Sequence, residues 1–185
     1  GRNEHEAFWS WATIETLRHT GVRIEELQEI THLGLVSYKL PKTGEIVPML
    51  QIVPSKNNEE RLLMVGPELA SVLATIITRL RNDNGGSVPL TARYDTHERV
   101  IGQPLPHLFQ HRVGWNWKVP SSNTIQNWLN ATLARAGIVD AAGRALGYTP
   151  HDFRRLWATE VVTNGLPVHI AARLMGHRNL NTTQS

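Results

Sequence analysis

The sequence predicts an α+β fold that is mainly α-helical and carries one small three-stranded antiparallel sheet. Two observations support this prediction. Apolar residues recur at helical spacing on both sides of the middle of the chain, whereas residues 33–66 hold three short strand-like runs separated by turn-forming segments. We expect one domain over residues 1–185, because 185 residues with 41% hydrophobic side chains can build a core.

The first part of the chain predicts two helices in succession. Residues 6–19 place an apolar stripe on one helix face, formed by Phe8, Trp11, Ala12, Ile14 and Leu17. Gly21 allows a tight break, and Glu25 and Glu26 suit the first turn of the next helix because acidic groups favour helix N-termini. The buried side of that helix is expected to hold Ile24, Leu27 and Ile30.

Three strands are expected at residues 35–40, 46–53 and 61–65. Lys42 lies in the first connection and Lys56 in the second, so each hairpin tip carries a lysine. Such a lysine is commonly a solvated charge, although its flexible stem can also deliver a proton or a charge to a phosphate. Residues 67–81 then predict a helix with apolar side chains at Leu69, Val72, Leu73, Ile76, Ile77 and Leu80.

Residues 88–120 give no clear secondary structure. His107 and His111 are four residues apart and would form a metal-binding pair if they were helical. No carboxylate or cysteine stands nearby as a third ligand, so we expect no metal site. The segment also mixes basic and aromatic groups that could contact a nucleic-acid backbone, or whose tryptophans could anchor the core or a loop: Arg112, Trp115, Trp117 and Lys118.

The last part of the chain begins with a helix that Ser121 or Ser122 caps and that ends near Gly137. Its inward residues are expected to be Ile125, Trp128, Leu129 and Leu133. Residues 141–148 predict a loop. Thr149, Pro150 and Asp152 then have the positions of an N-cap, a first helical residue and the second member of a capping box.

The helix after Thr149 places His151 and Arg154 on one face, from which we expect both to project. An adjacent apolar stripe should face the core: Phe153, Leu156, Trp157 and Val161. Gly165 ends this helix, Pro167 opens another, and that one stops at Gly176, directly before His177. Two imidazoles and a guanidinium near helix ends suit an anion such as a phosphodiester.

Composition excludes several classes of protein. The chain has no cysteine, which excludes a disulfide framework and a thiolate metal site. No apolar run reaches the roughly 18 to 20 residues of a membrane span. The P-loop, the dinucleotide glycine pattern, the serine-hydrolase elbow and HExxH are absent. Residues 1–90 carry 9 basic and 11 acidic side chains, and residues 91–185 carry 10 and 5, which indicates either an anionic partner or ordinary surface scatter.

The order of the motifs is more specific than any one of them. Arg23 follows Thr-Gly and precedes Glu26, a hairpin lysine comes next, and His151, Arg154 and His177 follow. TPHDFRRLWAT together with LMGHRNLNTTQ resembles the catalytic domain of the tyrosine recombinases, the phage-type integrases, from about residue 16 to residue 185. KNNEERLLMVGPEL resembles the hairpin between the second and third strands of that family, which selects Lys56 over Lys42.

The resemblance implies a role for each motif residue. Arg23 and Arg154 would clamp the scissile phosphate, and Glu26 would orient Arg23. His151 would bind a non-bridging oxygen and assist proton transfer, and His177 would donate a further hydrogen bond. Lys56 would be the general acid for the 5′-oxygen. Contacts to DNA would come from Arg23, Lys56, Arg154, Arg155 and Arg178.

The resemblance also implies site-specific DNA recombination, for integration or excision of a mobile element, through a 3′-phosphotyrosine and without a metal or nucleotide cofactor. The partner would be double-stranded DNA, bound by a homotetramer of the parent protein. That protein would be bacterial or phage-encoded, cytoplasmic and associated with the nucleoid. The family's nucleophilic tyrosine typically lies nine residues past the GH histidine, whereas Ser185 is eight past His177. Tyr38, Tyr94 and Tyr148 all precede that motif, so none is assigned as the nucleophile.

We therefore expect the chain to be a fragment, monomeric and inactive alone, without the family's N-terminal core-binding domain and C-terminal nucleophile segment. Three alternatives remain open. A type IB topoisomerase-like enzyme would share the chemistry, and a non-catalytic DNA-binding module could share the fold. A structural helical domain with coincidental histidines is the third.

Overall fold

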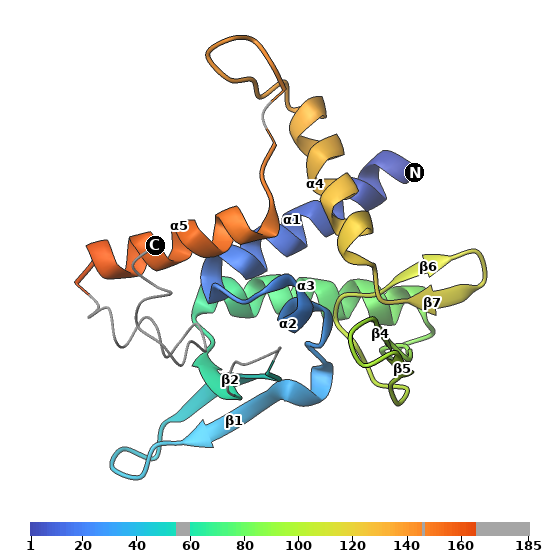
Figure 1. Ribbon diagram of the computed structural model, residues 1–185. Helices are drawn as coiled ribbons and strands as arrows, with labels where there is room; N and C mark the ends of the chain where they lie inside the picture. The colour runs from blue at the N-terminus through green and yellow to red at the C-terminus, as the bar shows by residue number, and fades with distance from the viewer. Residues whose placement is uncertain (55–59, 146, 166–185) are drawn as a thin grey trace. The chain divides into compact units, whose positions relative to one another are not determined.

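The structure, a computed structural model, describes residues 1–54, 60–145 and 147–165 (Figure 1). The described residues form two compact units: a helical unit of residues 1–24 together with residues 121–145 and 147–165, and a sheet unit of residues 25–54 and 60–120. The described elements are, in order, α1 (Arg2–Thr20), α2 (Ile24–Gln28), η1 (His32–Gly34), β1 (Leu35–Lys39), β2 (Ile46–Ile52), β3 (Arg61–Met64), α3 (Pro67–Asp83), β4 (Tyr94–Asp95), β5 (Val100–Ile101), β6 (His111–Val113), β7 (Asn116–Lys118), α4 (Ser122–Arg135) and α5 (Pro150–Thr163). The mainly helical α+β prediction is confirmed.

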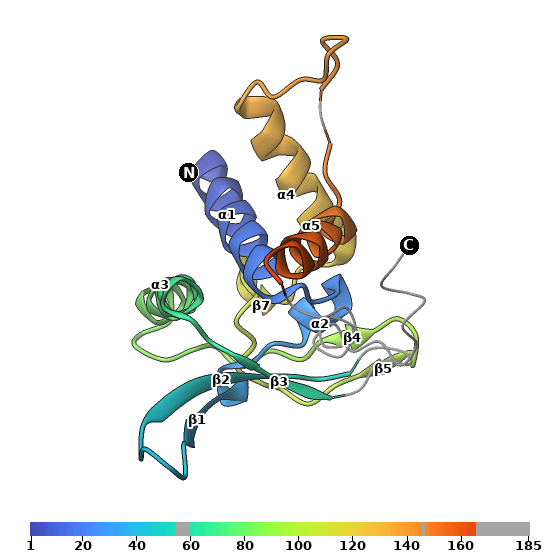
Figure 2. The same cartoon turned by 90° about the vertical axis from the view of Figure 1, so that its left-hand side faces the viewer.

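In the helical unit, α1 packs against both α4 and α5 (Figure 2). The predicted inward position of Trp11 was wrong, because Trp11 is 40% exposed and Trp9 is buried instead. The buried face of α1 also carries small polar residues: Ser10, Thr13, Thr16 and Thr20. The Thr20 hydroxyl donates to the Thr16 carbonyl oxygen at 2.6 Å, which satisfies it locally. Because this buried face contains serine and threonine, it does not appear as an apolar stripe in the sequence.

Helix α4 follows the sequence prediction closely. Ser121 is the N-cap, and its hydroxyl accepts a hydrogen bond from the backbone N–H of Thr124 at 3.1 Å. Ile125, Trp128 and Leu129 are buried as predicted. The buried indole of Trp128 stacks on that of Trp9, with ring centroids 6.3 Å apart, so aromatic packing joins α4 to α1.

In the sheet unit, the three predicted strands form an antiparallel sheet in the order β1-β2-β3. The central strand β2 pairs through Leu50 with Leu35 on β1 and with Leu63 on β3. Leu50, Leu63 and the neighbouring Ile52 are buried, so this row belongs to the core. Helix α3, also predicted, buries Leu69, Val72, Leu73, Ile76 and Leu80.

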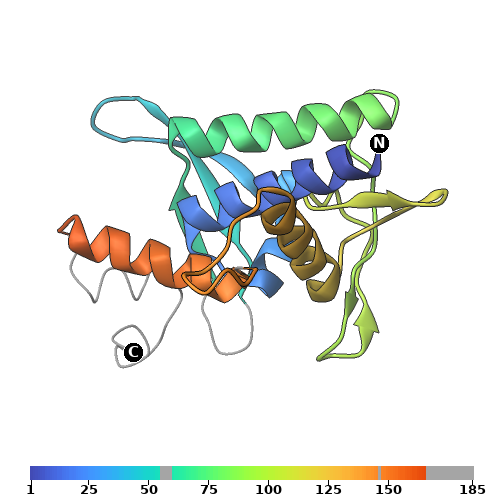
Figure 3. The ribbon, with the colours of Figure 1, turned by 90° about the horizontal axis from the view of Figure 1, so that it is seen from above.

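Residues 88–120 form two short antiparallel hairpins, β4–β5 and β6–β7, which the sequence did not predict (Figure 3). Strands of two or three residues are too short to show a period. The histidine pair considered as a metal site is not helical: His111 begins β6, and His107 is buried with Nδ1 3.0 Å from the carbonyl oxygen of Gln28. Since that oxygen can only accept, Nδ1 carries the hydrogen.

Membrane-spanning helices are not found in the described part of the chain, where every helix is too short or too polar to cross a bilayer. The same residues hold no cluster of three or more metal-binding side chains of the histidine, aspartate or glutamate type.

Candidate functional site

The first turn of α5 is fixed by a capping box. The backbone N–H of Asp152 donates to the Thr149 hydroxyl at 3.3 Å, and the backbone N–H of Thr149 donates to the Asp152 carboxylate at 2.8 Å. This second bond is the main reason why the pKa of Asp152 is lowered from its usual value. Pro150 occupies the first helical turn, where its missing N–H costs nothing. The box therefore sets the direction in which His151 and Arg154 leave the helix.

Arg154 points from α5 to the turn that ends α1. It is only 2% exposed, and its Nη1 donates a hydrogen bond to the carbonyl oxygen of Gly21. Gly21 is the C-cap of α1 in the left-handed conformation, with φ 64°. Its carbonyl is one of the groups that a helix end leaves without an intrahelical donor. The buried guanidinium of Arg154 thus joins α5 to the C-terminal end of α1.

Trp157 explains why a glycine stands at this turn. Its indole is buried and lies so close to Gly21 that an added β-carbon would be 2.4 Å from Cε3. Arg154 and Trp157 are three residues apart on α5, so one face of the helix brings both side chains to the Gly21 turn. The turn and the helix are therefore fitted to each other through two adjacent side chains.

Arg23 follows Gly21 by two residues and directly precedes α2, and it is half-buried. The segment that carries Arg23 is thus anchored to α5 through the Arg154–Gly21 hydrogen bond. His151, one helical turn before Arg154, is exposed. The expectation that His151 and Arg154 both project was wrong for Arg154, because its side chain binds the Gly21 turn. Arg155, the next residue, is exposed.

Glu26 lies in the sheet unit and is fully buried. Its carboxylate accepts two hydrogen bonds from the guanidinium of Arg61 at the start of β3, at 2.5 Å and 3.1 Å. Sequence reasoning did not single out Arg61, because no spacing rule relates two residues so far apart in the chain. The orienting role of Glu26 toward Arg23 stays a prediction.

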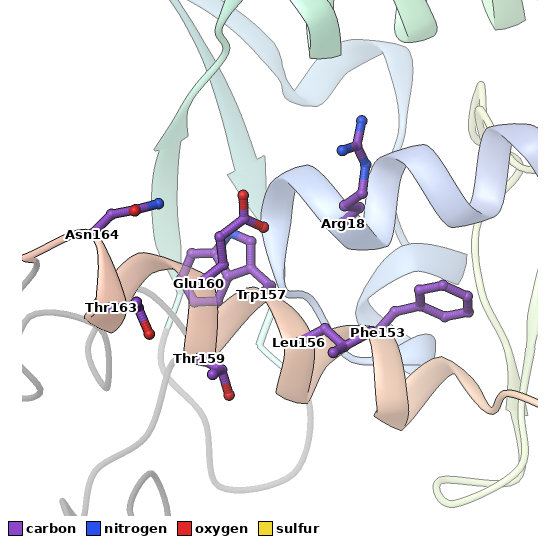
Figure 4. A pocket seen from close by; sticks show the side chains of 8 residues that line it. All are labelled: Arg18, Phe153, Leu156, Trp157, Thr159, Glu160, Thr163 and Asn164. Atoms are coloured by element: carbon purple, nitrogen blue, oxygen red, sulfur yellow. The ribbon is translucent and has the colours of Figure 1, made fainter.

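The outer side of α5 borders a groove of about 430 Å³ between α5 and the end of α1 (Figure 4). Phe153, Leu156 and Trp157 contribute its apolar wall, and Arg18 and Glu160 lie at its polar edge. Leu156 was expected to face the core but is 56% exposed. The reason is that Arg154 and Trp157 take the buried face of α5, which turns Leu156 into the groove.

Three residues of the predicted site lie outside the described residues: Lys56, His177 and Arg178. The structure brings together Arg154, the Arg23 segment and the His151 turn in the helical unit. A guanidinium presents fixed N–H donors to oxyanions, and an exposed imidazole can donate or accept a proton near neutral pH. The arrangement suits an oxygen-rich anion that undergoes proton transfer.

The chain is similar in sequence and in fold to proteins of one known family. The sequence profile of the phage integrase family matches residues 2–185. Tyrosine recombinase XerD of Lacticaseibacillus casei is 24% identical over 179 residues, which cover 94% of this chain and 48% of that protein. Tyrosine recombinase XerC of Bradyrhizobium diazoefficiens is 27% identical over 173 residues, covering 94% and 43%. The chain spans about half the length of these relatives.

Two solved structures show the same fold. The crystal structure of XerA recombinase has a TM-score of 0.65 at 20% identity, and the match covers 99% of this chain and 54% of that one. The Tn1549 transposon integrase in complex with transposon right end DNA has a TM-score of 0.62 at 18% identity, covering 97% and 58%.

Proposed function

This chain belongs to the phage integrase family, and on that premise we propose that it is the catalytic domain of a tyrosine recombinase that exchanges DNA strands at specific sites. The observation that carries the proposal is the hydrogen bond from Arg154 to Gly21. It ties together the segments that carry Arg23 and Arg154, the two arginines proposed for the phosphate. Neither segment alone would fix two guanidiniums with respect to one phosphate.

The proposed chemistry is an in-line attack on a phosphodiester. The hydroxyl of a tyrosine attacks phosphorus, the bond from phosphorus to the 5′-oxygen breaks, and the products are a 3′-phosphotyrosine and a free 5′-hydroxyl. The pentacoordinate transition state carries more negative charge than the diester, so Arg23 and Arg154 bind it more tightly than the substrate. None of Tyr38, Tyr94 and Tyr148 is proposed as the nucleophile.

Proton transfer falls to the remaining motif residues. In the proposal, Lys56 gives a proton to the departing 5′-oxygen, and His151 binds a non-bridging oxygen and assists transfer to or from the tyrosine. The exposure of His151 supports a contact with substrate. His177 donates a further hydrogen bond to the phosphate. Attack by the 5′-hydroxyl of a partner strand reverses the step and joins the exchanged strands, so no metal or nucleotide cofactor is required.

Double-stranded DNA is the proposed partner. Two structures of the same fold support this: XerH site-specific recombinase bound to difH substrate, and the Tn1549 integrase with transposon DNA. Contacts from Arg23, Lys56, Arg154, Arg155 and Arg178 to phosphates predict an affinity that falls steeply with salt. We further propose that the full-length protein acts as a homotetramer on DNA, in the bacterial cytoplasm and at the nucleoid.

The test measures cleavage by the full-length protein on a nicked duplex that traps the covalent complex. Arg154→Ala should lower the cleavage rate at saturating DNA at least ~100-fold, by analogy with the loss of one oxyanion donor. Because Arg154 also holds the Gly21 turn, His151→Gln is measured beside it; His151 is exposed, so its loss should spare folding. Arg144→Ala, at an exposed salt bridge with Asp140, is the matched control.

Near-normal cleavage by both the Arg154 and His151 variants would contradict the assignment of the site. Cleavage followed by relaxation of supercoils without strand exchange would instead identify a type IB topoisomerase-like enzyme. Tight DNA binding with no cleavage by the full-length wild type would identify a non-catalytic DNA-binding module.

A further inference from the structure

The β6–β7 hairpin, residues 111–118, presents an aromatic tip on a well-anchored base. Gly114 and Trp115 form its two-residue turn, and Gly114 has φ 64°, as the first central residue of a type II′ hairpin turn requires. Trp115 at the tip is 90% exposed. At the base, the Thr91 hydroxyl donates to the Trp117 carbonyl oxygen at 2.9 Å, and the preceding Leu108 and Phe109 are buried. The tip therefore projects into solvent from a packed and hydrogen-bonded base.

The two cations of this hairpin lie on opposite faces of the ribbon. Arg112 pairs with Trp117 and His111 pairs with Lys118, and directly paired residues share a face while adjacent residues alternate. Arg112 and Lys118 are both exposed. The guanidinium of Arg112 lies 5.9 Å from the centroid of the Trp117 ring, an arrangement that orders the side chain.

Along the chain, the charged residues on both sides of the hairpin are all basic. Between Glu98 and Asp140 the sequence holds no acidic residue, whereas it holds Arg99, Arg112 and Lys118 within the sheet unit. A hydrophobic protein contact would be expected to bury Trp115 among apolar neighbours, with acidic and basic groups mixed at the rim. The absence of carboxylates from this stretch of the chain instead favours a polyanion.

We propose that the β6–β7 hairpin is a second DNA-contacting element, separate from the residues assigned to the reacting phosphate. A two-stranded ribbon fits the major groove of B-DNA, which is about 12 Å wide. Trp115 enters the groove, and Arg112 and Lys118, on opposite faces, reach the phosphates of the two flanking strands. This proposal rests on the proposed function in one respect, that duplex DNA is the substrate.

The experiment measures binding of the full-length protein to a fluorescein-labelled duplex of mixed sequence by anisotropy. Trp115→Ala should weaken binding about tenfold and Trp115→Phe only about twofold, because a phenyl ring preserves most of the apolar contact with base edges in the groove, such as the thymine methyl group. The double variant Arg112→Gln/Lys118→Gln should reduce the slope of log affinity against log salt by about 2. Leu33→Ala, at another exposed apolar residue of the sheet unit with 68% exposure, is the matched control and should bind like the wild type.

Cleavage separates this proposal from the proposed function. At saturating DNA the hairpin variants should cleave at the wild-type rate, whereas Arg154→Ala should bind and fail to cleave. Wild-type affinity and salt slope in the hairpin variants would overturn the hairpin proposal and leave the function intact. Altered self-association of Trp115→Ala in light scattering, with DNA affinity unchanged, would also overturn it by showing a protein contact. A wild-type protein that binds no duplex would overturn both proposals.

Discussion

The indole of Trp157 lies against Gly21 so closely that an added β-carbon at position 21 would be 2.4 Å from Cε3 of the ring. Gly21 also has φ 64°, which non-glycine residues adopt at a cost of about 1–2 kcal/mol. Overpacking against a buried ring costs a further ~1–3 kcal/mol. Gly21→Ala should therefore lower the free energy of unfolding by about 3 kcal/mol, measured by chemical denaturation.

Gly137 provides the control for Gly21. It has φ 67°, and no heavy atom would lie within 4 Å of an added β-carbon. Gly137→Ala should lower the free energy of unfolding only by the cost of a positive φ at a non-glycine residue, about 1 kcal/mol. Equal losses in the two variants would show that the contact between Trp157 and Gly21 does not constrain the turn before Arg23.

Removing only one partner of the Glu26–Arg61 salt bridge should strongly lower the free energy of unfolding. Arg61→Met removes both Arg61 donors from the buried Glu26 carboxylate and should cost about 3–5 kcal/mol of unfolding free energy. The double variant Glu26→Gln/Arg61→Met should lose less unfolding free energy than Arg61→Met alone, because it removes the buried negative charge together with the Arg61 guanidinium. Arg144→Met breaks an exposed pair and should cost less than ~0.5 kcal/mol. Strict additivity of the Glu26 and Arg61 substitutions in a double-mutant cycle would contradict the coupling.

The cap of α5 should affect both stability and cleavage. Thr149→Ala removes the hydroxyl that accepts from the Asp152 N–H and should cost about 1 kcal/mol, whereas Thr149→Ser should be nearly neutral. In the full-length protein, Thr149→Ala should also slow cleavage, because His151 lies in the turn that the cap fixes. Ser121→Ala removes the equivalent cap of α4 and should cost similar stability without slowing cleavage. Equal cleavage by both cap variants would separate the α5 cap from the proposed site.

Local signals accounted for most of the elements that the sequence predicted. The three strands, α3 and the caps at Ser121 and Thr149 depend on alternation, helical spacing and short-range hydrogen bonds, which are visible within a few residues. The face of α1 was misjudged because it buries small serine and threonine side chains, of which Ser10 and Thr20 are hydrogen-bonded. A pattern based only on hydrophobicity therefore assigned Trp11 to the core in place of Trp9.

The features that were missed depend on contacts between distant segments. The β6–β7 hairpin is fixed at its base by Thr91, far earlier in the chain, and its strands are too short for a periodic signal. Arg61 binds Glu26 from a distant part of the sheet unit, and no sequence motif indicates this pairing. Arg154 could be named from the motif, but its burial against Gly21 follows from the packing of α5 on α1.

Stability should fall as the pH drops below about 6.5 because His107 is buried. Burial lowers the pKa of His107 below its usual value, while Glu29 opposes and Arg93 adds to the lowering. The unfolded chain then binds a proton that the folded chain excludes. This stabilisation is complete above about pH 6.5 and is lost, by at most ~1.4 kcal/mol per pH unit, as the pH falls toward the lowered pKa.

The measurement for His107 is the free energy of unfolding as a function of pH. His107→Gln removes the titrating group and should flatten the slope below about pH 6.5, even if it lowers stability at every pH. Gln103→Ala, at an exposed residue that does not titrate, should leave the wild-type slope unchanged. A wild-type slope in the His107 variant would assign the acid sensitivity to other groups.

The chemistry of the leaving group tests whether Lys56 is the general acid. Lys56→Ala in the full-length protein should slow cleavage of an ordinary 5′-oxygen substrate ~100-fold or more, because the departing alkoxide needs a proton. A 5′-thiolate leaves without one, so the same variant should cleave a 5′-thio substrate at nearly the wild-type rate. Lys42→Ala, at the other hairpin lysine and exposed in the turn after β1, should cleave both substrates normally. Equal slowing of the two substrates by Lys56→Ala would assign Lys56 to phosphate binding instead of acid catalysis, and a selective effect of Lys42→Ala would move the acid to the first hairpin.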